Sequence, residues 1–117
     1  MKNKTFFDSI KCAVQGMRYA LKSEKNFRIY IIIALIFFVL NLICRAELAM
    51  HMIFLTICGG VFSAEFINTS LERLSDKVDG NFSSEIKIVK DVAAAGVLVW
   101  GIIFFILEAV IIIGKFI

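Results

Sequence analysis

The segment AEFINTSLERLSD, Ala64–Asp76, carries carboxylate and amide side chains directly after a long apolar run. That run, Leu48–Ala64, contains no Asp, Glu, Lys or Arg. Burying carboxylates near lipid is expensive, so a chain that does so usually needs them for a function. The sequence therefore predicts a membrane helix that carries a row of functional polar groups where it leaves the bilayer.

The composition agrees with a membrane protein. Hydrophobic residues make up 60% of the 117 residues, and proline is absent. A soluble domain of this length cannot bury so much apolar surface, so a single membrane domain over residues 1–117 is expected. The net charge of +3 names no partner, and nucleic acid is not expected. The first apolar run begins only near residue 29, so a secretory signal peptide is not expected either.

Three stretches lack charged residues, and the last of them ends before Glu108. They are Ile29–Cys44, Leu48–Ala64 and Val92–Leu107. Each is slightly shorter than the roughly 20 residues that cross a hydrocarbon layer of ~30 Å, and flanking side chains that reach the interface can supply the missing turns. We predict three transmembrane helices, the second with a cytoplasmic extension, and a cytoplasmic loop at 77–86 with a turn at Asp79–Gly80. The predicted spans are 27–45, 47–75 and 88–115.

The N-terminal segment, 5–25, has a different pattern. Its apolar residues recur at helical spacing, with basic residues among the polar positions between them. The apolar residues are Phe6, Phe7, Ile10, Ala13, Val14, Met17, Ala20 and Leu21. A basic amphipathic helix of this kind lies in the membrane interface, although periodicity alone also allows packing on neighbouring protein.

Basic residues predict the orientation, because they are enriched on the cytoplasmic side. Most of them precede the first span or lie between the second and third spans, which places the N-terminus and the 77–86 loop in the cytoplasm. The basic residues on that side are Lys2, Lys4, Lys11, Arg18, Lys22, Lys25, Arg28, Arg73, Lys77, Lys87 and Lys90. The opposite side has Arg45 and Lys115.

At 100° per residue, Glu65, Asn68, Glu72 and Asp76 fall within about 80° of one another on a helix and climb one face over roughly 16 Å. Glu65 lies about 26 Å from the start of the span at Leu48, near the cytoplasmic edge of the hydrocarbon. Carboxylates bind Mg²⁺ together with substrate phosphates, and one more can act as a general base. The alternative is that the helix becomes polar simply because it leaves the membrane.

Two further polar clusters are expected on the same side of the membrane. Glu24 and Asn26 lie where the N-terminal helix meets the first span, and Lys90 and Asp91 lie at the start of the third. Taken singly, these residues are ordinary interfacial anchors. The sequence has no P-loop, G-x-S-x-G or H-E-x-x-H motif that would indicate another kind of active site. Small residues such as Gly59 and Gly60 indicate close helix packing.

Three blocks of the chain resemble the bacterial diacylglycerol kinase and undecaprenol kinase family. They are GMRYALKSEKNFR (16–28), AEFINTSLERLSD (64–76) and KIVKDVAAAGVLV (87–99). The second contains the pattern E-x-x-N-[ST]-x-x-E, and the K-D pair follows Asp76 by 14 residues, as in the family. The blocks cover nearly the whole chain in the expected order. One difference is NFS at 81–83, where the family commonly has a segment with histidine.

The resemblance implies an all-α, homotrimeric helical bundle in the bacterial cytoplasmic membrane, in which each chain has one surface helix and three transmembrane helices. It implies transfer of the γ-phosphate of MgATP to a lipid hydroxyl, with undecaprenol favoured over diacylglycerol. Glu65 takes the place of the general base, and Asn68 supports the site. Glu24 and Glu72 take the metal-binding places. The residues implied in nucleotide binding are Glu24, Glu72, Asp76, Lys90 and Asp91.

Two other classes compete with this interpretation. A small multidrug or proton-coupled transporter subunit also carries an intramembrane glutamate, but near the midplane and with no task for Lys90 and Asp91. A holin-like or purely structural oligomer needs no clustered carboxylates at all. ATP consumption in the presence of a lipid alcohol distinguishes the kinase from both.

Overall fold

The computed structural model describes residues 5–78 and 83–117, which form four helices and no strand. Helices α2, α3 and α4 are each long and apolar enough to cross a membrane. The predicted all-α architecture is therefore confirmed, with three helices that can span a membrane. The bounds of the four helices are α1 Phe6–Ser23, α2 Lys25–Ile43, α3 Leu48–Val78 and α4 Ser84–Phe116.

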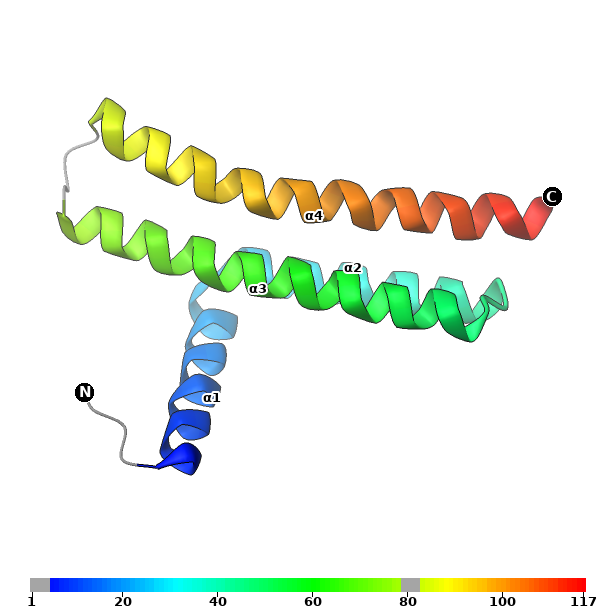
Figure 1. Cartoon of the computed structure of the whole chain (residues 1–117), viewed down its shortest axis with the longest axis horizontal. Coiled ribbons are helices and arrows are strands. Elements are labelled where there is room, and N and C mark those ends of the chain that lie inside the picture. Colours follow the sequence, from blue (N-terminus) through cyan, green and yellow to red (C-terminus); the bar gives the residue numbers. More distant parts are fainter. Residues whose placement is uncertain (1–4, 79–82) are drawn as a thin grey trace.

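The three helices that can span a membrane differ in length. Helix α2 has 19 residues, whereas α3 and α4 have 31 and 33. Because about 20 residues match a hydrocarbon layer of ~30 Å, α3 and α4 can both extend well past it. Figure 1 shows that the C-terminal end of α3 and the N-terminal end of α4 lie at the same end of the molecule. The two extensions therefore project together.

Helix α1 runs across the direction of the other three helices (Figure 1). It begins after Thr5, whose Oγ1 accepts a hydrogen bond from the backbone N–H of Asp8 at 3.1 Å. It ends before Glu24, whose backbone is extended at φ −110° and ψ 114°. Phe6 and Phe7 are 74% and 80% exposed. Exposed aromatic side chains on a helix in this direction agree with an interfacial location, which stays a prediction.

The two connections between membrane helices are short. Arg45 turns the chain after α2 with φ 55°, in the left-handed region, and the N–H of Ala46 donates to the carbonyl of Asn41 at 3.0 Å. At the other end, Ser83 caps α4 because its Oγ accepts from the N–H of Ile86 at 3.2 Å. Helices α3 and α4 thus extend into the predicted loop 77–86. The predicted turn at Asp79–Gly80 and the NFS segment up to residue 82 lie outside the described residues.

The largest interface joins α3 and α4, which run side by side (Figure 1). The cluster of buried apolar side chains at this interface consists of Phe54, Ile57, Phe104, Leu107 and Ile111. Gly60 allows the ring of Trp100 to approach, because a Cβ atom added at Gly60 would lie 2.5 Å from Cε2 of the indole. The packing role predicted for small residues in the second span therefore holds at this glycine.

A buried polar pair joins α2 to α4. Nδ2 of Asn41 donates to Oε1 of Glu108 at 3.0 Å, and the two residues are 0% and 1% exposed. Buried polar groups in a membrane protein need such partners, because lipid offers none. Glu108, which only marked the end of an uncharged stretch in the sequence, is therefore part of the interior of the helix bundle.

Candidate active site

A cavity of about 390 Å³ lies between α2, α3 and α4. Glu65, Asn68 and Glu72 of α3 line its polar end, together with Asn26 and Tyr30 of α2. The rest of the wall is almost entirely apolar and comes from all three helices: Ile33, Ala34, Cys58, Val61, Phe62, Ala94, Val97, Leu98, Gly101, Phe104 and Phe105. An apolar cavity with a few polar groups at one end suits a molecule with a polar head and an apolar tail.

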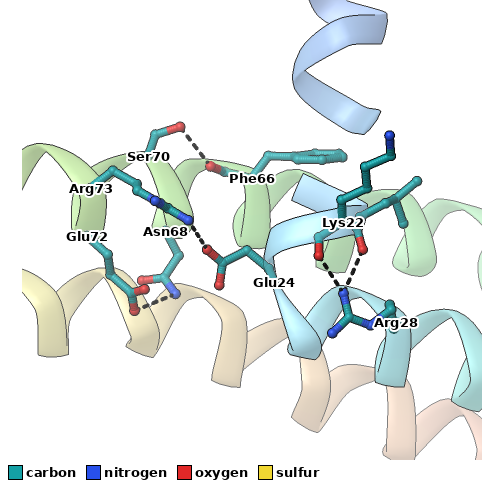
Figure 2. A network of polar contacts seen from close by, with 9 residues as sticks. Lys22, Glu24, Arg28, Phe66, Asn68, Ser70, Glu72 and Arg73 are labelled. Atoms are coloured by element: carbon teal, nitrogen blue, oxygen red, sulfur yellow. Dashed lines mark hydrogen bonds and ion pairs between the residues drawn. The ribbon is translucent and has the colours of Figure 1, made fainter. Parts of the chain in front are cut away.

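The three polar side chains of α3 form a connected row. Glu65 and Asn68 are 3% and 6% exposed, and the Asn68 amide lies close enough to the Glu65 carboxyl to interact with it. Nδ2 of Asn68 also lies 3.4 Å from Oε1 of Glu72, a long hydrogen bond drawn in Figure 2. Oδ1 of Asn68 is buried and has no partner within the described residues. The amide therefore connects the two carboxylates and keeps one acceptor atom unpaired.

Helix α2 contributes a second partner for Glu65. The hydroxyl of Tyr30 lies close enough to the Glu65 carboxyl to interact with it. The start of α2 is fixed against α3 by Phe27, which is 1% exposed and whose ring centroid lies 4.5 Å from that of Phe66. This aromatic contact holds the two helices in the register that brings Tyr30 to Glu65.

Glu24 reaches the same end of the molecule from the break between α1 and α2. Its carboxylate interacts electrostatically with Glu65, as does that of Glu72. Oε1 of Glu24 lies 3.1 Å from Nη2 of Arg73 on α3 (Figure 2). Three of the carboxylates predicted for the site, Glu24, Glu65 and Glu72, are thus brought near one another from two different segments.

The other predicted residues lie outside the cavity lining. Nζ of Lys90 is 2.6 Å from Oδ1 of Asp76, which joins α4 to α3. Asp91 accepts from Nζ of Lys87, one turn earlier on its own helix, at 2.5 Å. Asp76 and Asp91 have side chains that are 66% and 61% exposed. The carboxylates of Asp76 and Asp91 are therefore open to solvent, where a soluble nucleotide could reach them.

The carboxylates fit a magnesium ion that arrives with a nucleotide better than a metal held by protein alone. Within residues 5–78 and 83–117, no three His, Cys, Asp or Glu side chains converge as a ready-made metal site. Mg²⁺ usually takes only one or two protein carboxylates and completes its shell with water and substrate phosphates. Glu24 and Glu72 could supply that number, because each carries carboxylate oxygens and interacts electrostatically with Glu65.

The structure adds two residues that the sequence-based prediction did not assign to the site. Tyr30 follows Asn26 by four residues, so helical spacing already puts both on one face of α2. Arg73 counted only as one of the basic residues that set the orientation. Its contact with Glu24 depends on how α1 turns into α2, and no spacing along a single helix contains that information.

Comparison with known proteins identifies the family. Residues 11–112 match the model of the prokaryotic diacylglycerol kinase family. The chain is also 28% identical over 110 residues to undecaprenol kinase of Bacillus subtilis strain 168, which covers 94% of this chain and 89% of that protein. A kinase of this family implies ATP and a divalent metal, and the family excludes the transporter and holin-like alternatives. The chain therefore belongs to the prokaryotic diacylglycerol kinase family and is a lipid kinase that spans the membrane with several helices.

Proposed function

We propose that the protein transfers the γ-phosphate of MgATP to the hydroxyl group of undecaprenol, with diacylglycerol as the less favoured acceptor. The observation that carries this proposal is the cavity in which Glu65, Asn68 and Glu72 form one end of an otherwise apolar wall. A lipid alcohol has the same division, with one hydroxyl and a long apolar chain. The name of the Bacillus subtilis relative favours undecaprenol as the acceptor. The segment SEKNFR (23–28) also favours it, because this segment resembles the Gram-positive members of the family, which prefer undecaprenol.

In the proposed mechanism, the hydroxyl enters the polar end of the cavity and donates a hydrogen bond to Glu65 or to the unpaired Oδ1 of Asn68. Its oxygen forms a bond to the γ-phosphorus while the bond from that phosphorus to the bridging oxygen of ADP breaks. The hydroxyl proton passes to Glu65, which Tyr30 and Asn68 hold in place. Phosphoryl transfer passes through a loose transition state, so positioning matters more than early removal of the proton.

The remaining predicted residues receive binding roles. Glu24 and Glu72 would hold Mg²⁺, which when bound neutralises charge on the ATP phosphates. Asp76, Lys90 and Asp91 would contact the nucleotide where α3 and α4 extend beyond the lipid. Lys90 brings a cation to this region, and its pairing with Asp76 keeps that cation between the two helices.

The proposed setting is the bacterial cytoplasmic membrane, with the N-terminus and the active site facing the cytoplasm. The distribution of basic residues supports this orientation. Helix α1 would lie in the interface, and three copies of the chain would form the helical bundle. Exposed apolar side chains on all three membrane helices, among them Leu35, Leu55 and Leu98 at 60–64%, support contact with lipid or with other copies.

The test compares the two acceptors side by side. Purified protein in mixed micelles would receive labelled ATP and either undecaprenol or diacylglycerol, with and without Mg²⁺, and the labelled lipid phosphate would be measured. We expect metal-dependent transfer with a higher kcat/KM for undecaprenol. A higher value for diacylglycerol would reverse the assignment of the acceptor, and an absence of transfer to both lipids would contradict the proposed function.

A further inference from the structure

We propose that Arg73 is a positioning residue that holds the carboxylate of Glu24 at the metal-binding end of the active site. The inference rests on the proposed function, because it gives Arg73 a task only if Glu24 binds the metal. It concerns a residue that neither the predicted site nor the cavity includes.

Glu24 needs such a partner because its position in the chain does not restrict the rotamer of its side chain. It is the residue between α1 and α2, and its extended conformation interrupts the two helices. It occupies the N-cap position of α2 without making the side-chain hydrogen bond that N-cap residues often make. A long side chain at such a break has many rotamers available, and holding one of them requires contacts from elsewhere.

Arg73 supplies those contacts. Nη2 of Arg73 lies 3.1 Å from Oε1 of Glu24, and the guanidinium carbon lies 5.1 Å from the ring centroid of Tyr19. A cation within about 6 Å of an aromatic centroid is attracted to the ring face. Arg73 belongs to α3, and its guanidinium contacts Tyr19 of α1. The same guanidinium holds the carboxylate of Glu24 at the break between α1 and α2. Figure 2 shows Arg73 extending from α3 to Glu24.

A different residue, Arg28, fixes the backbone at the break between α1 and α2. Nη1 of Arg28 donates to the carbonyl of Leu21 at 2.9 Å and to that of Lys22 at 3.0 Å (Figure 2). These bonds satisfy carbonyls in the last turn of α1, which lack partners within the helix. Since Arg28 fixes the path of the chain, the contact with Arg73 acts on the side chain of Glu24.

Because Arg73 follows Glu72 directly, helix α3 can both line the cavity and contact Glu24. Neighbouring residues on a helix point about 100° apart, so Glu72 can line the cavity while Arg73 faces the end of α1. Arg73 contacts Oε1 of Glu24, so the second carboxylate oxygen can face a cation. Both side chains are partly exposed, at 52% and 24%, and pairs of this kind contribute little to stability. Positioning is therefore the larger expected effect.

Arginine is needed for this geometry. Its planar guanidinium can stack on Tyr19 and pair with Glu24 at the same time, whereas a lysine ammonium offers a single flexible point charge. Arg73→Lys keeps the charge and loses the planar arrangement, which makes it a test of geometry at constant charge.

The experiment measures metal binding directly. Full-length protein in detergent would bind Mn²⁺ together with a non-hydrolysable ATP analogue, followed by electron paramagnetic resonance, and thermal unfolding would be recorded for each variant. We expect Arg73→Gln to weaken Mn²⁺ binding by about 10-fold or more, the range for residues that orient metal ligands, and Arg73→Lys to restore only part of it. The melting temperature should stay at the wild-type value. Lys77→Gln, four residues further along α3 and exposed, removes the same charge and should leave Mn²⁺ binding unchanged.

A double variant tests whether Arg73 acts through Glu24. If it does, Glu24→Gln with Arg73→Gln should bind Mn²⁺ no more weakly than Glu24→Gln alone. Unchanged or tighter binding in Arg73→Gln, or a further loss in the double variant, would overturn the inference and leave the proposed function standing. Wild-type binding in both Glu24→Gln and Glu72→Gln would instead remove the proposed metal site, and the inference with it.

Discussion

Glu65 is buried at 3% exposure, whereas the side chains of Glu24 and Asp76 are 24% and 66% exposed. The carboxylates of the proposed site therefore occupy different environments. Glu65 lies against the apolar wall, where a lipid hydroxyl would arrive, and its carboxyl lies close to the side chains of Tyr30 and Asn68. The exposed carboxylates lie where nucleotide and metal would come from water. This difference in exposure supports Glu65 as the general base and the exposed carboxylates as ligands of the metal or the nucleotide.

Glu65→Gln tests this assignment. The amide keeps the size and much of the hydrogen bonding of the carboxylate but cannot take the hydroxyl proton. We expect the variant to fold, to bind MgATP nearly as well as wild type and to lose turnover by about 10²–10⁴-fold, as is typical of acid–base groups. Nucleotide affinity by calorimetry and lipid phosphate formed per minute measure the two effects.

The two measurements separate the possible roles. Retained turnover would remove Glu65 from the mechanism. Loss of nucleotide binding together with turnover would make Glu65 a ligand for the metal or the nucleotide, contrary to the prediction.

At the scale of helices, α3 and α4 are held close by a glycine facing a tryptophan. A methyl group at Gly60 would lie 2.5 Å from Cε2 of Trp100, and either the ring or a helix must then move. Because α4 also lines the cavity through Ala94 and Gly101, this contact sets the width of the site as well as the packing.

We expect Gly60→Ala to destabilise the protein by about 1–3 kcal/mol, the usual effect of adding atoms to a packed interior. Gly59→Ala is the matched control, because a Cβ atom at Gly59 meets nothing within 4 Å in the single chain. Thermal unfolding in detergent compares the two variants. Equal stability of Gly60→Ala and wild type would show that Trp100 can move aside freely.

Helices α2 and α4 are held together by a buried hydrogen bond between Asn41 and Glu108. Asn41→Leu would leave the Glu108 carboxyl buried without its amide partner, and we expect a loss of about 1–3 kcal/mol. Replacing both residues by leucine removes the unpaired group and should recover much of that loss. If the double variant is less stable than Asn41→Leu alone, Glu108 has a role beyond this pair.

Considered as a whole molecule, the single chain leaves much apolar surface uncovered. Exposed apolar side chains occur on every membrane helix, and α2 packs less extensively on α3 than α4 does. A chain with three membrane helices has little material to enclose both a nucleotide and a lipid head. Assembly of several copies would complete the enclosure.

We therefore expect an oligomer, and the resemblance to the kinase family implies that it is a homotrimer. Native mass spectrometry or chemical cross-linking in mild detergent should give a species of three chains. A monomer as the sole species, under conditions in which the protein still phosphorylates lipid, would contradict this prediction.

The membrane helices and the polar row of α3 can be predicted from the sequence alone. An uncharged stretch of sufficient length can satisfy its backbone in lipid only as a helix, so composition alone predicts the three spans. Glu65, Asn68 and Glu72 belong to one helix, and the fixed rotation per residue places them on one face whatever surrounds them. Their common location in the cavity follows from that periodicity.

The contacts between side chains of different helices cannot be predicted in this way and depend on how the helices pack. The contacts of Tyr30 with Glu65, of Arg73 with Glu24 and of Asn41 with Glu108 each join different elements. They depend on how far each helix is rotated about its axis and on the direction in which the chain leaves Glu24, and hydrophobic periodicity specifies neither. The physical reason is that lipid-facing helices are apolar on most sides, so close packing of glycines, aromatic rings and buried polar pairs selects the face that turns inward.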